Sequence, residues 1–181
     1  LAPAKAELAS HTPRVASWGG GGNDLINFIL SPQNRTCSRG NASCLARVNA
    51  LLNEIEQTVD RTLREVRQAA GSSAPVYVRT QYNPLQTSCA SAPPFLAGPG
   101  SPLAALADIA LEATPAHGLK LLQRGLNTRL RELAARHDAL VIDTYVPFRL
   151  TPDALIGDDC VHPNDLGHTT IFELAKMATG L

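Results

Sequence analysis

Hydrophobic positions along the chain fall into short continuous runs and longer periodic stretches. Apolar runs at residues 14–18, 75–80 and 139–143 are bounded by glycine, proline or polar residues, which predicts three buried strands. From residue 43 to residue 70, apolar side chains recur every three or four positions, which predicts a long amphipathic helix that ends at Gly71. Strands and a helix therefore follow one another along the chain.

Further helices are predicted between and after the strands. A short helix follows residues 19–24, leucines spaced along residues 119–133 mark another, and a last helix starts near Asn164. Residues 81–116 are rich in proline, alanine, glycine and serine, and show helical periodicity only near 103–111. A connection of this length commonly forms a lid or a binding wall.

The alternation of strands and helices predicts an α/β fold with a parallel sheet covered on both faces. In such sheets, ligands bind beyond the carboxyl ends of the strands. Two glycine-rich and polar segments are expected at that rim, residues 19–24 after the first strand and residues 157–168 after the third.

Length, charge and hydropathy narrow the class of protein. The chain has 181 residues, 44% of them hydrophobic and 18% charged, which suits one domain with a packed core and excludes intrinsic disorder. Sixteen basic and sixteen acidic side chains give no electrostatic signature for a nucleic-acid partner. No apolar run approaches the ~20 residues that span a bilayer, so an integral membrane protein is not expected.

Four cysteines, Cys37, Cys44, Cys89 and Cys160, allow three disulfide pairings. The short spacing favours Cys37 with Cys44, which leaves Cys89 for Cys160. This pairing indicates a secreted or otherwise extracytoplasmic protein, whereas four unrelated thiols would indicate a cytosolic one.

The segment 157–168 carries an acid and a base at a suggestive spacing. Asp159 lies three residues before His162 and can fold its carboxylate back onto the imidazole Nδ1, which would fix the tautomer and stabilise the imidazolium. Pro163 disfavours helical backbone at His162 and keeps that histidine on the loop. The alternative is that His162 is a packing or capping residue before the last helix.

The segment 19–24 carries an amide. Asn23 follows the predicted strand on a run of glycines, so its side-chain NH₂ can be aimed at a developing oxyanion. The alternative is a glycine-rich turn in which Asn23 or Asp24 caps a helix.

Together, Gly21-Gly22-Asn23-Asp24 and Asp159 through His168 resemble two signature blocks of the SGNH, or GDSL, hydrolase family. The resemblance implies a three-layer α/β/α sandwich with a flavodoxin-like parallel sheet, and hydrolysis of acyl esters, lipids or acetylated sugars without a metal or organic cofactor. It makes Asn23 the oxyanion-hole residue, His162 the general base and Asp159 the acid that orients it. Some secreted members use a backbone carbonyl in place of that acid. His168 belongs to the motif but is expected to be structural.

The sequence departs from the family pattern at the nucleophile. The family serine lies in a Gly-Asp-Ser motif on the first strand, ahead of the Asn block, and this motif is absent here. Ser72 and Ser101 follow glycines but lie at a helix end and in the long connection. Residues 1–181 are therefore expected to be the larger, C-terminal part of one domain. A companion N-terminal segment or chain would supply the serine and pair with the strand at 14–18, which otherwise has an open edge.

Three residues are expected to contact the substrate: Gly22 beside Asn23, and Phe95 and Leu96 in the long connection. One alternative function is an SGNH-like binding domain that has lost its nucleophile and its activity. A second alternative is a metal site made from the acids and histidines of the last loop, Asp158, Asp159, His162, Asp165 and His168.

Overall fold

The computed structural model describes residues 2–10, 15–34, 36–38, 40–71, 74–89 and 98–180. Within these residues, three parallel strands form one sheet in the order β1 (Ala16–Trp18), β2 (Val76–Arg79) and β3 (Leu140–Ile142). Each strand lies inside one of the three apolar runs, and the central strand β2 pairs with both others.

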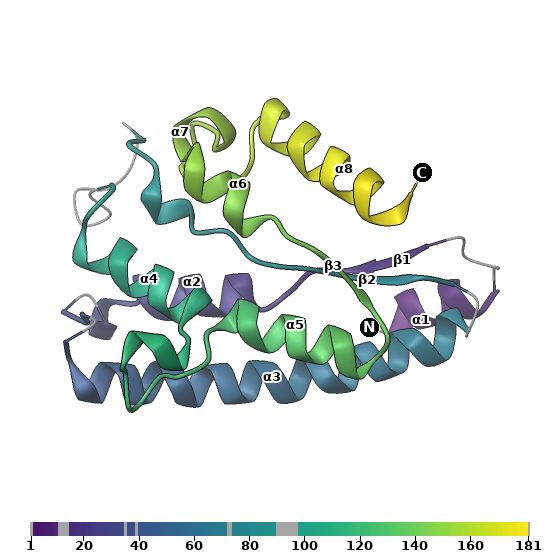
Figure 1. Cartoon of the computed structure of the whole chain (residues 1–181), viewed down its shortest axis with the longest axis horizontal. Coiled ribbons are helices and arrows are strands. Elements are labelled where there is room, and N and C mark those ends of the chain that lie inside the picture. The colour runs from purple at the N-terminus through teal and green to yellow at the C-terminus, as the bar shows by residue number, and fades with distance from the viewer. Residues whose placement is uncertain are drawn as a thin grey trace.

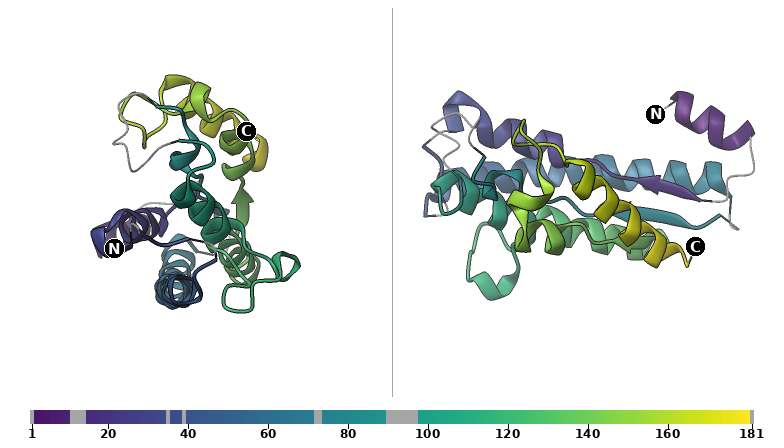
Figure 2. Two further views of the ribbon diagram at one scale, coloured as in Figure 1. Left: turned by 90° about the vertical axis from the view of Figure 1, so that its left-hand side faces the viewer. Right: turned by 90° about the horizontal axis from the view of Figure 1, so that it is seen from above.

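Helices cover both faces of this sheet (Figure 1). The helices are α1 (Ala2–Ser10), α2 (Gly22–Leu30), α3 (Ala42–Ala70), α4 (Pro102–Glu112), α5 (Leu126–Arg136), α6 (Tyr145–Leu150), α7 (Pro152–Leu155) and α8 (Asp165–Thr179). The 29-residue helix α3 and α5 lie below the sheet in this view, with α2 and α4 beside them, whereas α6, α7 and α8 lie above it. Figure 2 shows the same layers from the end and from above. The fold is a three-layer α/β/α sandwich, as predicted.

Side chains of β2 alternate between the two helical layers, as those of a pleated strand must. Val76 and Val78 are buried in the clusters built on α3 and α5. Tyr77 points to the other layer, where its hydroxyl donates to the Ala178 carbonyl of α8 at 3.4 Å. Arg79 lies on this same side, because it is two positions after Tyr77 along the strand. This direction brings its guanidinium to the rim beneath α8.

Helix α5 begins later than the leucine spacing over residues 119–133 predicts. The helix starts at Leu126, because Gly125 packs against the chain that leaves α4. The Gly125 N–H donates to the Ala113 carbonyl at 2.9 Å, and a Cβ at Gly125 would lie only 2.6 Å from the Ala113 nitrogen. Leu122 is still fully buried, but it reaches the core from a loop.

Two disulfides join segments outside the sheet. Cys37 pairs with Cys44 and Cys89 with Cys160, the same pairing that the spacing favours. The second bridge connects the loop after β2 to the loop that carries His162. Among the helices of the described residues, none has the length and hydropathy to cross a membrane.

Candidate active site

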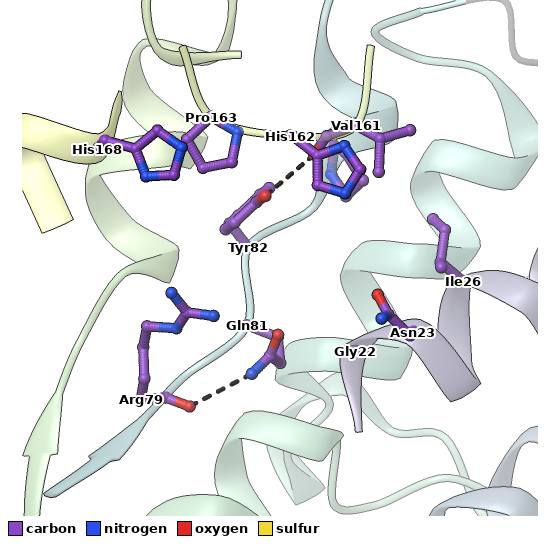
Figure 3. Close-up of a pocket in the computed structure, with 11 residues that line it drawn as sticks. Gly22, Asn23, Ile26, Arg79, Gln81, Tyr82, Val161, His162, Pro163 and His168 are labelled. Atoms are coloured by element: carbon purple, nitrogen blue, oxygen red, sulfur yellow. Dashed lines mark hydrogen bonds between the residues drawn. The ribbon is translucent and has the colours of Figure 1, made fainter. Parts of the chain in front are cut away.

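Three segments far apart in the sequence meet at the carboxyl end of the sheet and enclose a cavity of about 290 Å³ (Figure 3). They are the start of α2, the residues that follow β2, and the loop before α8. The described residues that line it are Gly22, Asn23, Ile26, Arg79, Gln81, Tyr82, Pro84, Val161, His162, Pro163 and His168. The two signature segments of the sequence therefore face one space.

His162 and Asp159 form the contact expected from their spacing. The His162 Nδ1 lies 2.6 Å from the Asp159 Oδ2, and the Asp159 Oδ1 accepts the backbone N–H groups of His162 at 2.8 Å and Val161 at 3.0 Å. These bonds, that of the His162 N–H first, lower the pKa of Asp159 to about 2. The ionised carboxylate favours a proton on Nδ1 and leaves the His162 Nε2 free as a base.

Backbone contacts hold the loop that carries this pair. The Gly157 N–H donates to the His162 carbonyl at 2.8 Å, and the Asn164 side chain caps α8 by accepting the Gly167 N–H at 2.9 Å. From the other side, the Tyr82 hydroxyl donates to the Val161 carbonyl at 3.0 Å. The Cys160 bridge adds a covalent tie one residue before Val161.

The structure explains by close packing why position 167 of the motif is a glycine. A Cβ at Gly167 would overlap the Leu155 carbonyl oxygen and lie 2.8 Å from the Pro163 Cβ. The first turn of α8 can approach α7 and the loop of His162 this closely only because Gly167 has no side chain.

We therefore expect Gly167→Ala to lower the free energy of unfolding by about 1–3 kcal/mol, as overpacking does. Gly157→Ala, in the same loop, is the matched control, since its Cβ would lie 3.5 Å from the nearest atom, the His162 carbonyl oxygen. Thermal and urea denaturation of both variants measures the difference. Equal midpoints for Gly167→Ala and Gly157→Ala would contradict this account.

Asn23 lies in the first turn of α2, and its exposed side chain borders the cavity (Figure 3). The turn before it uses Gly21, whose φ of +84° favours glycine. Gly22 lies against the side-chain amide of Gln81, which a Cβ at Gly22 would overlap in its present position. Gly22 thus gives the Gln81 side chain room at the floor of the cavity.

Sequence reasoning missed three cavity residues, Arg79 at the end of β2 and Gln81 and Tyr82 after it. Gln81 is held on both sides of its backbone by the fully buried Asn127, which accepts its N–H at 2.7 Å and donates to its carbonyl at 2.8 Å. The signal for these residues was their position directly after a predicted strand, since the carboxyl ends of all strands share the ligand rim. Burial raises the pKa of Tyr82 to about 12, so its hydroxyl stays protonated.

Other predicted residues lie elsewhere. Phe95, Leu96 and Ser72 lie outside the described residues. Ser101 caps α4, where its hydroxyl accepts the Ala104 N–H at 3.1 Å. Among the residues that the structure describes, no group of three or more histidines, cysteines or acids is arranged to hold a metal ion.

The described part of the chain places no nucleophile beside His162. No serine or cysteine is among the described residues that line the cavity. Asp159 supplies the one hydrogen bond that a described side chain makes with the His162 ring.

An α/β/α sandwich with a His–Asp pair and an asparagine at its ligand rim is the arrangement expected of the hydrolase family that the sequence resembles. The model of the GDSL-like lipase/acylhydrolase family matches residues 2–170, and the chain belongs to this family. This match confirms the resemblance carried by the Asn23 and His162 segments. No curated protein sequence gives a significant match.

Two solved structures that are similar to this chain have low sequence identity to it, and the first of them shares its fold. The lipase Lip_vut3 from a goat rumen metagenome is 19% identical with a TM-score of 0.62, over 96% of this chain and 67% of that one. LAE5, an α/β hydrolase enzyme from the metagenome of Lake Arreo in Spain, is 18% identical with a TM-score of 0.48, over 99% of this chain and 65% of that one. The chain thus spans about two thirds of the length of each.

Proposed function

We propose that the protein hydrolyses carboxylic esters through a serine nucleophile, with His162 as general base and Asp159 as the acid that orients it. The observation that carries this proposal is the 2.6 Å contact between the His162 Nδ1 and the Asp159 Oδ2, beside a cavity that Asn23 also borders. Membership of a lipase and acylhydrolase family supports the same reaction class.

In this mechanism, His162 Nε2 takes the proton of the serine hydroxyl as the serine oxygen attacks the ester carbonyl. The oxyanion that forms accepts a hydrogen bond from the Asn23 NH₂ and from backbone N–H groups. Collapse of the intermediate breaks the bond to the alcohol, which leaves with the proton from His162. A water molecule, deprotonated by His162, then hydrolyses the acyl-serine. Ionised Asp159 stabilises the imidazolium in both steps.

The serine is proposed to lie on a segment outside this sequence that pairs with β1. Among the described residues, β1 pairs only with β2, so its outer edge is open. A groove of about 400 Å³ lies between the end of β1 and α3, and one of about 370 Å³ lies between α8 and the face of the sheet, where it includes residues of β1. A strand added at this edge would border both grooves. Residues 1–181 would then form the larger, C-terminal part of one domain.

The outer surface of α8 supports the same arrangement. Two large apolar side chains of α8, Phe172 and Met177, expose 61% and 71% of their surface in the described structure. A helix from the completing segment would cover them.

An alternative function is an SGNH-like domain that binds a ligand without catalysis. The observation in its favour is that no described serine lines the cavity. For the active protein, we propose an acyl ester of a small molecule or a lipid as the substrate. The two disulfides are compatible with an extracytoplasmic location, which we also propose.

A serine-reactive fluorophosphonate tests these proposals on the protein isolated in its natural form, with its intact mass measured first. We expect a mass above the 19.2 kDa of these residues, and a label that peptide mass spectrometry maps to a serine outside residues 1–181. A folded 19.2 kDa species that hydrolyses esters would contradict the external serine. A folded protein of full mass that neither takes the label nor hydrolyses esters would support the inactive binding domain.

A further inference from the structure

Arg79 brings a positive charge into the candidate active site. The side chain is partly buried at the end of β2, and it lines both the cavity of His162 and the groove beneath α8. None of the described side chains pairs with its guanidinium. Arg131, which also lies near the carboxyl end of the sheet, differs in this respect, since it binds Glu112 at 2.9 Å and Asp143 at 2.9 Å.

Gly19, directly after β1, leaves room for this guanidinium. A Cβ at Gly19 would lie 3.2 Å from the Arg79 Nε and 3.3 Å from its Nη2, so the guanidinium lies directly over the Gly19 backbone. Its charge also acts on the Tyr82 hydroxyl, where it opposes the rise in pKa that burial causes. The Tyr82 hydroxyl is already committed to the Val161 carbonyl and does not compete for a ligand of Arg79.

The described lining of the cavity offers this charge no counter-ion. It contains Arg79 and two histidines, His162 and His168, but no carboxylate. The carboxylate of Asp159 is bound to the backbone and ring of His162 and is not part of this lining. A half-enclosed cation with weakened hydration attracts an anion strongly, and the planar fork of arginine matches a carboxylate or phosphate group in particular.

We propose that Arg79 binds an anionic oxygen group of the substrate, so that the enzyme prefers compact esters that carry a carboxylate or phosphate. The ester part of this inference rests on the proposed function. Figure 3 shows the Arg79 guanidinium on the side of His168, across Gln81 and Tyr82 from Asn23. If the ester carbonyl of the substrate lies between His162 and Asn23, the rest of the substrate can therefore extend toward Arg79. A cavity of about 290 Å³ is at the lower end of the range for small-molecule sites, which favours a compact substrate.

Matched neutral and anionic esters test the proposal on the natural-form protein. 4-Nitrophenyl butyrate is compared with 4-nitrophenyl hemisuccinate, and phenyl acetate with 4-acetoxybenzoate, which places the carboxylate on the acyl or the alcohol side. We expect Arg79→Gln to lower kcat/KM for the anionic ester of at least one pair by about 10- to 100-fold, the value of a charged hydrogen bond, mainly through KM. The neutral ester of that pair should lose clearly less than the anionic one, and Arg79→Lys should retain part of the preference. Arg149→Gln, an exposed arginine outside the cavity, is the control.

Two outcomes would overturn the role of Arg79. One is an unchanged ratio of anionic to neutral ester in both pairs. The other is an equal loss on all four esters with a lower melting temperature, which would mean that Arg79 pairs with a carboxylate of the protein. If no ester is hydrolysed, the proposed function fails instead. Isothermal titration calorimetry with succinate and with 4-hydroxybenzoate then still tests the role of Arg79. The proposal requires that the unmodified protein bind at least one of these two anions and that Arg79→Gln abolish this binding.

Discussion

Replacement of His162 by glutamine is expected to lower kcat for ester hydrolysis by about 10⁴-fold, the upper range for loss of a general base. Glutamine keeps the approximate size of the side chain but cannot accept the serine proton. Because 75% of the His162 side chain is exposed, the substitution removes little packing and the melting temperature should stay the same. Steady-state kinetics with a 4-nitrophenyl ester, together with circular dichroism, measures both effects.

Two further variants sharpen this experiment. His117→Gln changes an exposed histidine outside the cavity and should leave kcat intact. Asp159→Asn should lower kcat less than His162→Gln does, because 55% of the Asp159 side chain is exposed and water can partly replace its charge. Activity of His162→Gln within tenfold of the unmodified protein would show that His162 is not the base.

Asn23→Ala is expected to lower kcat by about 10²- to 10³-fold, as removal of one oxyanion donor does, with little change in KM. The effect is confined to the transition state because the negative charge on the carbonyl oxygen develops only there. The exposed Asn23 side chain makes no hydrogen bond with a described residue, so its truncation should not destabilise α2.

The matched control is Asn27→Ala, on the same helix and equally exposed but outside the cavity lining. The ratio of kcat between the Asn23 and Asn27 variants isolates the contribution of the amide from that of an alanine in α2. Equal kcat values for the two variants would remove Asn23 from the oxyanion hole and leave only backbone N–H groups for that role.

Several elements of the fold could be predicted because their signals are local. The three strands appear as short apolar runs, and α3 follows from a strict spacing of apolar residues that ends at a glycine. The contact between Asp159 and His162 could also be predicted from local sequence, because a spacing of three residues in a loop is enough to bring the carboxylate to the imidazole. Family membership rests on such local blocks as well.

Other elements could not be predicted because their causes lie far away in the sequence. The start of α5 depends on Gly125 against the chain after α4, a contact that leucine spacing does not encode. The short helices α6 and α7 have too few turns for periodicity to reveal them. Gln81 was missed because its position depends on Asn127, which is 46 residues away in the sequence.

The sequence by itself determined the order of strands and helices, the acid and base in one loop, and the asparagine after the first strand. Each of these depends on neighbours within a few residues. Only the tertiary structure decided that Asn23, His162 and Arg79 border one cavity, and that Arg79 faces it without a described counter-ion. These features arise when the carboxyl ends of parallel strands are brought side by side, and that placement depends on packing between segments distant in the chain.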